Sequence, residues 1–531
     1  MINQEIQDLI TQAVKKAYPS IVMPIFMVEL AEEKFGDYST NIAMILAKAV
    51  GESPLEIAEK IIKIIRESEN QDIIESATVA KPGFINFKIA LPYFQNQILE
   101  VIKAGDNYGT NNIGQSQKVD VEFISANPTG PLTVGNSRGG VIGDVLSSVL
   151  SKAGYAVTRE YYFNDAGGQI DILGHSVIKD EKAEYKGDYI DELHEKLGKG
   201  DYREIGQQAA QILIAEIKKT TQKMGINFDV WFAEGTDLRD KGKVEAIIQW
   251  FKQKNLVYEK DGAWWFKSTQ FGDDKDRVLL RSNGEPTYFA LDCAYHKNKF
   301  EIRKFDQVIN IWGADHHGDL ARLNGFVHAL GYEDKFHILI HQFVRIMQGD
   351  KEVRMSKRTG NYITVDELLD EVGRDVYRFF MLEYAPNSHL TFDLALAKER
   401  SQKNPVYYVQ YAYARINSIL GKSEIRNSKL ETISNDQIMK LLKEPAEIQL
   451  TKQIIKFPEL VEEIANDFQV QKLPFFAKEL AESFHHFYEK CPIIKSGDTN
   501  LTAARLVLLN ATKIVLKNTL DLMGITAPEK M

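Results

Sequence analysis

The chain contains the glycine-rich segment Ser125-Ala126-Asn127-Pro128-Thr129-Gly130-Pro131-Leu132-Thr133-Val134-Gly135-Asn136-Ser137-Arg138-Gly139-Gly140. An alternating run that is typical of a strand ends near Ile124, just before it, and an apolar run that is typical of a helix, Val141 to Leu150, follows it. A glycine-rich turn from a parallel strand into a helix lets the backbone approach a polyphosphate, because the helix N-terminus attracts anions. The segment therefore predicts a nucleotide site. Taken alone, a tight turn with small residues for packing explains it equally well.

The pattern around this segment predicts a doubly wound, Rossmann-like α/β fold. Between residues 106 and 395, short apolar runs alternate with helical segments, as in Gln307 to Trp312 followed by a helix from Asp319 to Leu330. Such alternation is typical of a parallel sheet with helices on both faces. A charged helical stretch, residues 170–255, interrupts the alternation, and we expect it to be an insertion.

Two further domains are expected at the ends of the chain. Residues 1–105 are predicted to form an α/β domain, in which Ser53-Pro54 starts a helix and residues 79–89 form a turn and a strand. Residues 396–531 are predicted to form an all-α bundle whose last helix, 502–523, ends at Gly524. One helical stripe in this bundle consists of Phe476, Leu480, Phe484 and Phe487.

The composition is that of an ordinary globular protein. Of the 531 residues 44% are hydrophobic and 26% charged. No run approaches the roughly 20 apolar residues of a membrane span, and the polar start lacks the pattern of a signal peptide. We therefore expect a cytoplasmic location without membrane contact. The net charge of -9 argues against nonspecific coating of nucleic acid, although a local basic face remains compatible with it.

A second segment of chemical interest is the basic loop Lys351-Glu352-Val353-Arg354-Met355-Ser356-Lys357-Arg358-Thr359-Gly360-Asn361. Lysine ammonium groups on a loop can neutralise the charge that develops on a transferring phosphoryl group and its pyrophosphate leaving group. A solvated charged turn is the more frequent explanation of such a run by itself.

Together the two segments resemble the paired signatures of class I aminoacyl-tRNA synthetases. The first reads Thr133-Val134-Gly135-Asn136 where the family has His-x-Gly-His, and the second reads Arg354-Met355-Ser356-Lys357-Arg358 where it has Lys-Met-Ser-Lys-Ser. The similarity is closer to the arginine-specific branch and runs through nearly the whole chain. Its blocks are Ala126 to Pro131, Gly272 to Arg277, Trp312 to Gly318, Asn404 to Arg415 and Ala527 to Met531.

The resemblance implies a reaction and its ligands. An arginine–tRNA ligase uses ATP, with Mg²⁺, to convert L-arginine to arginyl-adenylate, and then transfers arginine to the 3′ terminal ribose of tRNA(Arg), giving arginyl-tRNA, AMP and diphosphate. We expect a monomer. No protein-bound zinc is expected, because the two cysteines cannot complete a four-ligand site and Asp315, His316 and His317 are neighbours on one short loop.

The resemblance also assigns residues to ATP. Lys357 takes the place of the lysine that stabilises the transition state. Thr133 and Asn136 stand where the family commonly has histidines, so neutral hydrogen bonding is kept while imidazolium charge is lost. The implied catalytic residues are thus Thr133, Asn136 and Lys357, and the implied ATP-binding residues are Gly135, Asn136, Gly313, Asp315, His316, Met355, Ser356 and Lys357.

Arginine needs acceptors at both of its ends. By the same resemblance Glu122, Ser125 and Asn127 meet the α-amino end, while Tyr288 and Asp292 line the side-chain pocket. The spacing of the last two would put them on one side of a helical turn. Without the resemblance, a surface acid and a core aromatic would be the more frequent explanations.

Two clusters are implied to contact tRNA through stacking and hydrogen bonding. The N-terminal cluster is Phe35, Tyr38 and Asn41, and the C-terminal one is Tyr407, Tyr411 and Arg415. A capped turn that leads into a helix at 42–50 explains the first cluster equally well, and part of the second region must be helix core.

Two other functions compete with this one. A non-catalytic, tRNA-binding paralogue would explain Thr133 and Asn136, but the retention of Lys357, Asp292 and the block from Trp312 to Gly318 speaks against it. A small-molecule nucleotidyltransferase would share the first motif, but this function would not explain the C-terminal helical bundle.

Overall fold

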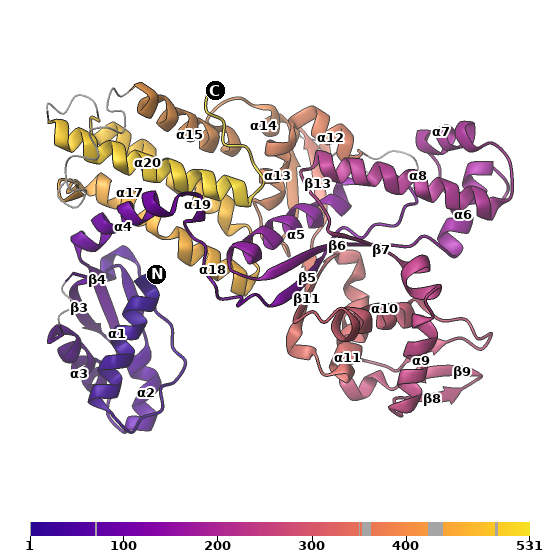
Figure 1. Cartoon of the computed structure of the whole chain (residues 1–531), viewed down its shortest axis with the longest axis horizontal. Coiled ribbons are helices and arrows are strands. Elements are labelled where there is room, and N and C mark those ends of the chain that lie inside the picture. Colours follow the sequence, from indigo (N-terminus) through magenta and orange to yellow (C-terminus); the bar gives the residue numbers. More distant parts are fainter. Residues whose placement is uncertain (1, 69–71, 350, 353–362, 423–438, 494–497) are drawn as a thin grey trace.

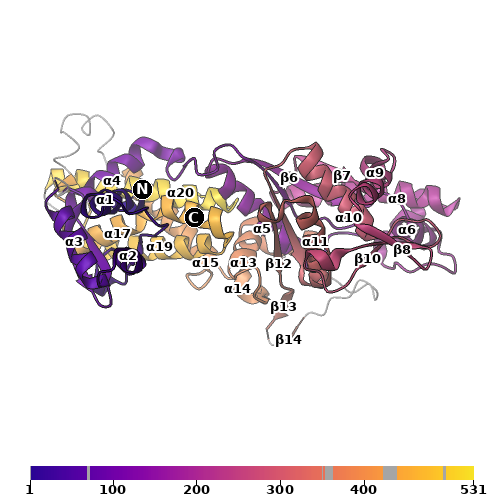
Figure 2. The same ribbon diagram turned by 90° about the horizontal axis from the view of Figure 1, so that it is seen from below.

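The computed structural model describes residues 2–68, 72–349, 351–352, 363–422, 439–493 and 498–531. It shows an elongated molecule (Figure 1 and Figure 2). The N-terminal α/β part and the C-terminal helices lie toward one end, and a parallel sheet with its helices lies toward the other.

The middle part of the chain forms a five-stranded sheet in the order β12-β11-β5-β6-β7, and every pairing in it is parallel. Its strands are β5 (Lys118–Glu122), β6 (Ala156–Phe163), β7 (Val230–Ala233), β11 (Gln307–Gly313) and β12 (Phe336–His341). The chain runs outward from β5 to β7 and then returns on the other side of β5 as β11 and β12. This reversal opens a crevice at the carboxyl ends of β5 and β11, where such sheets bind ligands. The predicted doubly wound fold is confirmed.

Helix α5 (Val134–Lys152) packs on this sheet and fixes one side of the crevice. It is buried along most of its length. Gly143 permits the close approach to β5, because a Cβ atom there would lie 2.3 Å from the Cγ atom of Phe123. The predicted strand-to-helix turn is confirmed, and small residues in this region do serve packing.

The chain leaves the sheet after β6 as a helical arm. The arm consists of α6 (Gly168–Ile178), α7 (Asp188–Leu197) and α8 (Tyr202–Lys223) and has a small apolar core of its own. The chain then returns to the sheet as β7. Part of the range 170–255, which we expected to be an insertion, therefore belongs to the central sheet.

The remaining elements of the central region surround the crevice. Between β7 and β12 these are α9 (Lys243–Gln253), an antiparallel sheet of β8 (Val257–Lys260), β9 (Ala263–Phe266) and β10 (Arg277–Leu280), then α10 (Tyr288–Lys297) and α11 (Leu320–Leu330). After β12 follow β13 (Val344–Gln348), β14 (Lys351–Glu352), α12 (Val365–Val372), α13 (Arg374–Leu382), β15 (Leu390–Asp393) and α14 (Leu394–Lys398).

The N-terminal part is an α/β unit, as predicted. Its antiparallel sheet has the order β1-β2-β4-β3, with β1 (Glu29–Leu30), β2 (Tyr38–Thr40), β3 (Ile74–Ala80) and β4 (Phe84–Ile89). Helices α1 (Ile2–Ala17), α2 (Ile42–Val50) and α3 (Pro54–Arg66) accompany it. Ser53 and Glu56 form a capping box at the start of α3, which explains why the helix begins where the sequence predicts.

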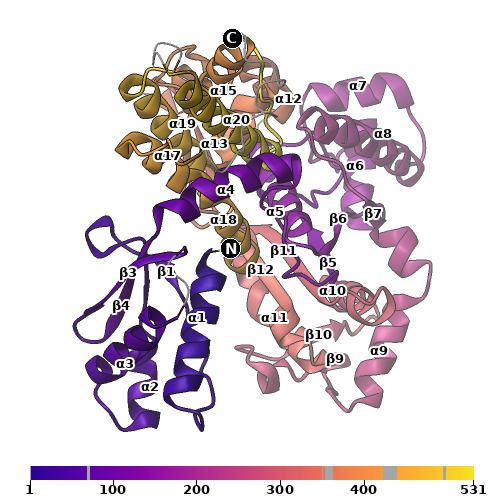
Figure 3. The ribbon, with the colours of Figure 1, turned by 60° about the vertical axis from the view of Figure 1, so that its left-hand side comes forward.

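The C-terminal part is a helical bundle, as predicted. It consists of α15 (Pro405–Lys422), α17 (Pro445–Ile455), α18 (Phe457–Asp467), α19 (Lys472–Lys490) and α20 (Thr499–Leu522). The predicted stripe of Phe476, Leu480, Phe484 and Phe487 is buried on α19. Helix α4 (Leu91–Ala104) runs from the N-terminal sheet onto this bundle (Figure 3).

Contacts between the parts are extensive, so the proposed boundaries at residues 105 and 395 stay predictions. Lys452 pairs with Asp37 at 2.5 Å across the contact between the N-terminal unit and the bundle. Arg378 of α13 donates to the Met523 carbonyl at 2.6 Å and thus ties the end of α20 to the central region. In the part of the chain that the structure describes, no helix is long and apolar enough to cross a membrane.

Candidate active site

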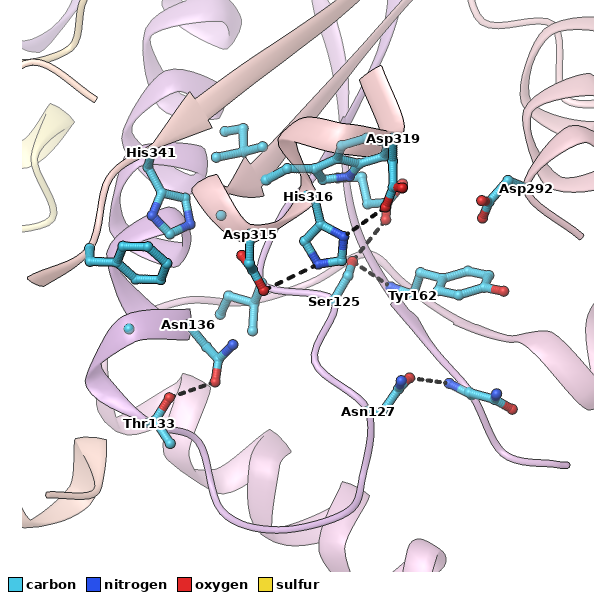
Figure 4. A pocket seen from close by; sticks show the side chains of 18 of the residues that line it. Ser125, Asn127, Thr133, Asn136, Tyr162, Asp292, Asp315, His316, Asp319 and His341 are labelled. Atoms are coloured by element: carbon cyan, nitrogen blue, oxygen red, sulfur yellow. Dashed lines mark hydrogen bonds and ion pairs between the residues drawn. The ribbon is translucent and has the colours of Figure 1, made fainter. Parts of the chain in front are cut away.

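A cavity of about 930 Å³ lies at the carboxyl ends of β5 and β11 (Figure 4). This volume is near the upper end of the roughly 300–1,000 Å³ of ordinary ligand pockets. The sequence-predicted residues that line the cavity are Glu122, Ser125, Asn127, Thr133, Gly135, Asn136, Tyr288, Asp292, Gly313, Asp315 and His316. Chain topology thus brings together side chains from distant segments at one edge of the sheet.

The N-terminus of α5 forms one wall of the cavity. Thr133 precedes the helix, and its Oγ1 atom donates a hydrogen bond to Oδ1 of Asn136 at 2.7 Å instead of capping the helix. This bond orients the Asn136 amide and leaves its Nδ2 atom as the donor on the cavity side (Figure 4). Because the first backbone N–H groups of a helix lack partners within the helix, the wall suits an anionic ligand.

The turn after β11 forms a second wall. Gly313 ends the strand, and Asp315 and His316 follow in a short 3-10 turn. The Nε2 atom of His316 lies 3.8 Å from Asp315 Oδ2, and its Nδ1 atom lies 3.4 Å from Asp319 Oδ2. His317 is exposed and does not line the cavity. Among the described residues, no group of His, Cys, Asp and Glu has an arrangement that could hold a metal ion.

Glu122, the last residue of β5, and Ser125 and Asn127, which follow the strand, line the cavity. Ile124 and Ser125 have left-handed backbones, with φ of 66° and 43°, so the chain turns sharply here. The Ser125 hydroxyl donates to Glu122 Oε1 at 2.9 Å and accepts from the Tyr162 amide at 3.1 Å. The Asn127 amide donates to Gln169 Oε1 at 2.7 Å. These bonds hold polar groups in fixed positions around one part of the cavity.

Tyr288 and Asp292 lie one turn apart on α10, and both line the cavity. Tyr288 is 54% exposed, so the interpretation as a core aromatic is wrong. Burial raises the pKa of Asp292 to about 7, and the nearby Arg322 opposes the shift. A bound cation would stabilise the ionised carboxylate, which makes Asp292 a good partner for a guanidinium.

Sequence reasoning missed several polar residues of the cavity, among them Glu234 and His341. Glu234 follows β7 and accepts hydrogen bonds from the Tyr162 hydroxyl and from Arg239, each at 2.7 Å. His341 ends β12, and burial lowers its pKa to about 4, so its ring is neutral at physiological pH. Both follow the rule that ligands lie beyond the carboxyl ends of parallel strands. Glu234 could not be found in this way, because β7 was hidden in the range expected to be helical.

The basic loop that carries Met355, Ser356 and Lys357 lies outside the described residues, so the roles assigned to these three remain predictions. Described residues on its near side, Arg345 and Glu352, line the cavity.

The N-terminal cluster is split between surface and interior. Phe35 is 48% exposed and Asn41 is exposed, whereas Tyr38 is only 2% exposed. The Tyr38 hydroxyl donates to the two carboxylate oxygens of Glu459 at 3.0 and 3.1 Å. The prediction that Tyr38 stacks on a base is wrong, because its ring is packed between the N-terminal sheet and the bundle. The turn leads into α2 at Ile42 as expected, but Asn41 makes no side-chain cap bond; the Ile42 amide instead donates to Thr40 Oγ1 at 3.4 Å.

The C-terminal cluster forms a stripe on α15. Tyr407, Tyr411 and Arg415 are half-buried and follow one another at helical spacing. The rings of Tyr407 and Tyr411 stack with centroids 6.3 Å apart, and the Arg415 guanidinium lies 5.9 Å from the Tyr411 ring. Tyr413, in contrast, is 4% exposed and belongs to the core of the bundle. Tyr411 also stacks on His485, and Arg415 lies over the Tyr488 ring, so part of the stripe packs against α19.

Models of protein families match almost the whole chain. Residues 4–89 match the arginyl tRNA synthetase N terminal domain, and residues 409–531 match the DALR anticodon binding domain. Residues 97–197 and 178–394 match the catalytic domain of class I (R) tRNA synthetases.

Full-length relatives point the same way. The chain is 43% identical over 558 aligned positions to the arginine–tRNA ligase of Acetivibrio thermocellus, covering 100% of this chain and 98% of that protein. It is 41% identical over 557 positions to the arginine–tRNA ligase of Desulforudis audaxviator, covering 99% and 98%. The solved Thermus thermophilus arginyl-tRNA synthetase has the same fold, with a TM-score of 0.81 over 100% of both chains at 23% identity.

Proposed function

The chain belongs to the arginine–tRNA ligase family, and from this membership we propose how its central cavity works. The chain is a class I aminoacyl-tRNA ligase that converts L-arginine to arginyl-adenylate with ATP and transfers the arginyl group to the 3′ terminal ribose of tRNA(Arg), releasing AMP and diphosphate. One observation carries the residue assignments: donors suited to a polyphosphate and acceptors suited to arginine line a single cavity.

ATP binds between the N-terminus of α5 and the turn after β11. Gly135 and Asn136 offer N–H donors to the phosphates, and Thr133 acts by orienting the Asn136 amide. Gly313, Asp315 and His316 lie on the other wall and contact the nucleoside part. Mg²⁺ enters with ATP as part of the substrate, since it prefers phosphate oxygens and water to a protein cage. Met355, Ser356 and Lys357 complete this site from the basic loop.

Arginine binds across the cavity between β5 and α10. Its guanidinium faces Asp292 and packs against Tyr288, which is accessible from the cavity. Its α-ammonium group is received by Glu122, Ser125 and Asn127, whose side chains are held by hydrogen bonds to their neighbours. The carboxylate is thereby left free to approach the α-phosphorus of ATP.

Catalysis follows from this placement. The arginine carboxylate attacks the α-phosphorus in line, the bond to the β-phosphate oxygen breaks, and pyrophosphate leaves. Positioning and charge stabilisation lower the barrier, so no protein nucleophile is required. Lys357 neutralises the charge that moves toward the leaving group. A ribose hydroxyl of tRNA then attacks the adenylate carbonyl and releases AMP.

The tRNA is held at two separate places. Phe35 and Asn41 are exposed on the N-terminal unit, and Tyr407, Tyr411 and Arg415 form the stripe on α15. Aromatic rings and arginine side chains stack on unpaired bases, which suits the loops of a folded RNA. We propose that a monomer is the working unit. We assign this activity to the cytoplasm.

Pyrophosphate exchange with and without tRNA tests the proposal. We expect L-arginine-dependent exchange into ATP, with tRNA required for this first step, and we expect Asp292→Asn to abolish it at low arginine. Exchange that is absent under both conditions would favour the non-catalytic paralogue. Exchange with an unchanged requirement for arginine in Asp292→Asn would mean that the amino acid lies elsewhere.

A further inference from the structure

A buried cluster of charged side chains lies directly behind the cavity. It consists of Asp120, Glu122, Glu160, Lys299 and Arg303, of which Asp120, Glu160 and Lys299 have no exposed side-chain surface. Only Glu122 of these residues also lines the cavity. The cluster therefore reaches the ligand through a single carboxylate.

Lys299 is the centre of this cluster. Its Nζ atom lies 2.7 Å from Glu122 Oε2, 2.8 Å from Asp120 Oδ2 and 3.9 Å from Glu160 Oε1. Burial opposes its charge, but Asp120 and Glu122 raise the pKa of Lys299 above its ordinary value, so it is an ammonium ion. Arg303 pairs with Glu160 on the far side.

The charges of the cluster do not balance by themselves. Asp120, Glu122 and Glu160 carry one negative charge each when ionised, against the positive charges of Lys299 and Arg303. The other polar neighbours are neutral: Tyr295 donates to Glu160, and burial lowers the pKa of His296 to about 3. Burial raises the pKa of Asp120 to about 7, so a cation that binds from the cavity side would favour the fully ionised cluster.

Both oxygens of Glu122 are tethered. Oε2 is held by Lys299 and Oε1 accepts the Ser125 hydroxyl at 2.9 Å, so the carboxylate cannot turn away from the cavity. Lys299 comes from the π-helical turn Asn298–Ile302 that directly continues α10, the helix that carries Tyr288 and Asp292. One continuous segment therefore supplies Tyr288 and Asp292, which are proposed to contact the guanidinium, and also Lys299, which holds Glu122 on the other side of the cavity. Such π-turns recur at functional sites.

We propose that Lys299 is a positioning residue for amino-acid recognition: it fixes the place and orientation of the Glu122 carboxylate, so that Glu122 selects a ligand with a free α-ammonium group. The proposal rests on the proposed function, because it deepens the role given to Glu122. An uncharged residue at position 299 would remove the ammonium group that lies between Asp120 and Glu122, so their repulsion would turn the Glu122 carboxylate out of its place. A rotated Glu122 carboxylate attracts an ammonium group poorly.

The test compares L-arginine with 5-guanidinopentanoate, which has the same side chain and carboxylate but lacks the α-amino group. Isothermal titration of the full chain gives both dissociation constants. In Lys299→Met combined with Asp120→Asn, the net charge of the cluster is unchanged. The dissociation constant for L-arginine should rise by about 10- to 100-fold, the usual effect of losing a charged hydrogen bond, while that for the analogue stays within about threefold.

Matched variants separate positioning from folding. Lys299→Gln with Asp120→Asn keeps a donor toward Glu122 and should restore part of the preference for L-arginine. Thermal unfolding identifies which of the two double variants folds, and the dissociation constants are compared in a variant that unfolds in a single cooperative transition. Glu160→Gln removes an acid that does not line the cavity and lies 3.9 Å from Lys299 Nζ, and it should keep the wild-type ratio of the two constants.

The outcomes are distinguishable. The proposal is overturned if the double variants of Lys299 and Asp120 weaken the binding of L-arginine and of the analogue equally. It is also overturned if Glu160→Gln reduces the preference for L-arginine over the analogue as much as the double variants do. If Glu122→Gln loses the preference but the double variants keep it, Lys299 is structural and the proposed function stands. If Glu122→Gln itself keeps the preference, the assignment of Glu122 within the proposed function fails.

Discussion

Asp292 should make arginine binding depend on pH in a range where the guanidinium itself never titrates. Burial raises the pKa of Asp292 to about 7 in the empty cavity. A guanidinium binds the ionised carboxylate, so the acid must lose its proton before or during binding. The apparent dissociation constant then grows by the factor 1 + 10^(pKa − pH). This factor is about 1.1 at about pH 8 and about 11 at about pH 6, so affinity should fall roughly tenfold between these values.

Isothermal titration with L-arginine at several pH values measures this slope. Repeating the titration near neutral pH in buffers of different ionisation enthalpy should show the release of about half a proton per arginine bound. Asp292→Asn should weaken binding by roughly 2–5 kcal/mol and abolish the slope, because no proton remains to be displaced at this position. Burial raises the pKa of Asp120 to about 7 as well. A pH dependence that disappears in Asp292→Asn is therefore due to Asp292 and not to Asp120. An unchanged wild-type affinity between the two pH limits, or a slope that persists in Asp292→Asn, would refute the reasoning.

Three further results are expected. Asp292→Asn should raise the thermal midpoint of the arginine-free protein at alkaline pH and not below about pH 4: the unfolded chain ionises this acid near its ordinary pKa, so the cost of its raised folded-state pKa builds up as pH rises from about 4 and is complete above about 7. Lys357→Ala should slow single-turnover adenylation by roughly 10²–10³, the effect of losing one transition-state donor, and an unchanged rate would remove Lys357 from the mechanism. Tyr411→Ala should raise the Michaelis constant for tRNA by the equivalent of about 1–3 kcal/mol while those for arginine and ATP stay unchanged. Tyr413→Ala, which empties a core position, should instead lower the melting temperature without that selectivity.

The sequence predicted the central fold well because its signals are local. Apolar runs, glycine positions and caps depend on near neighbours, as at Ser53 and Glu56, where one capping box fixes the start of α3. The four-residue strand β7 gave no such signal, and its place in the sheet depends on pairing with β6, far away in the chain. Glu234 was lost with it. The cavity residues near Asn136 were found because a motif marks them, whereas His341 has no motif around it.

Asp120 and Lys299 illustrate a second limit. Each would be assigned to the surface from its residue type, since charged side chains are rarely buried without partners. Their burial is tolerated only because strand β5 and the turn after α10 bring them within 2.8 Å of each other. The two positions are separated by most of the central region, so the pair becomes visible only when the sheet is assembled.

Tyr38 was misassigned for a reason that bears on how tRNA would be held. Residues on a strand alternate between two faces, and on β2 Tyr38 faces inward, where its hydroxyl reaches Glu459 of the bundle. Its neighbour Asp37 pairs with Lys452 of the same bundle at 2.5 Å. The segment that ends in the exposed Asn41 therefore also fastens the N-terminal unit to the bundle that carries the α15 stripe. The contacts of Tyr38 with Glu459 and of Asp37 with Lys452 join the two units that carry the proposed tRNA contacts. Packing between these units therefore sets the distance between the two proposed contacts in the protein without RNA.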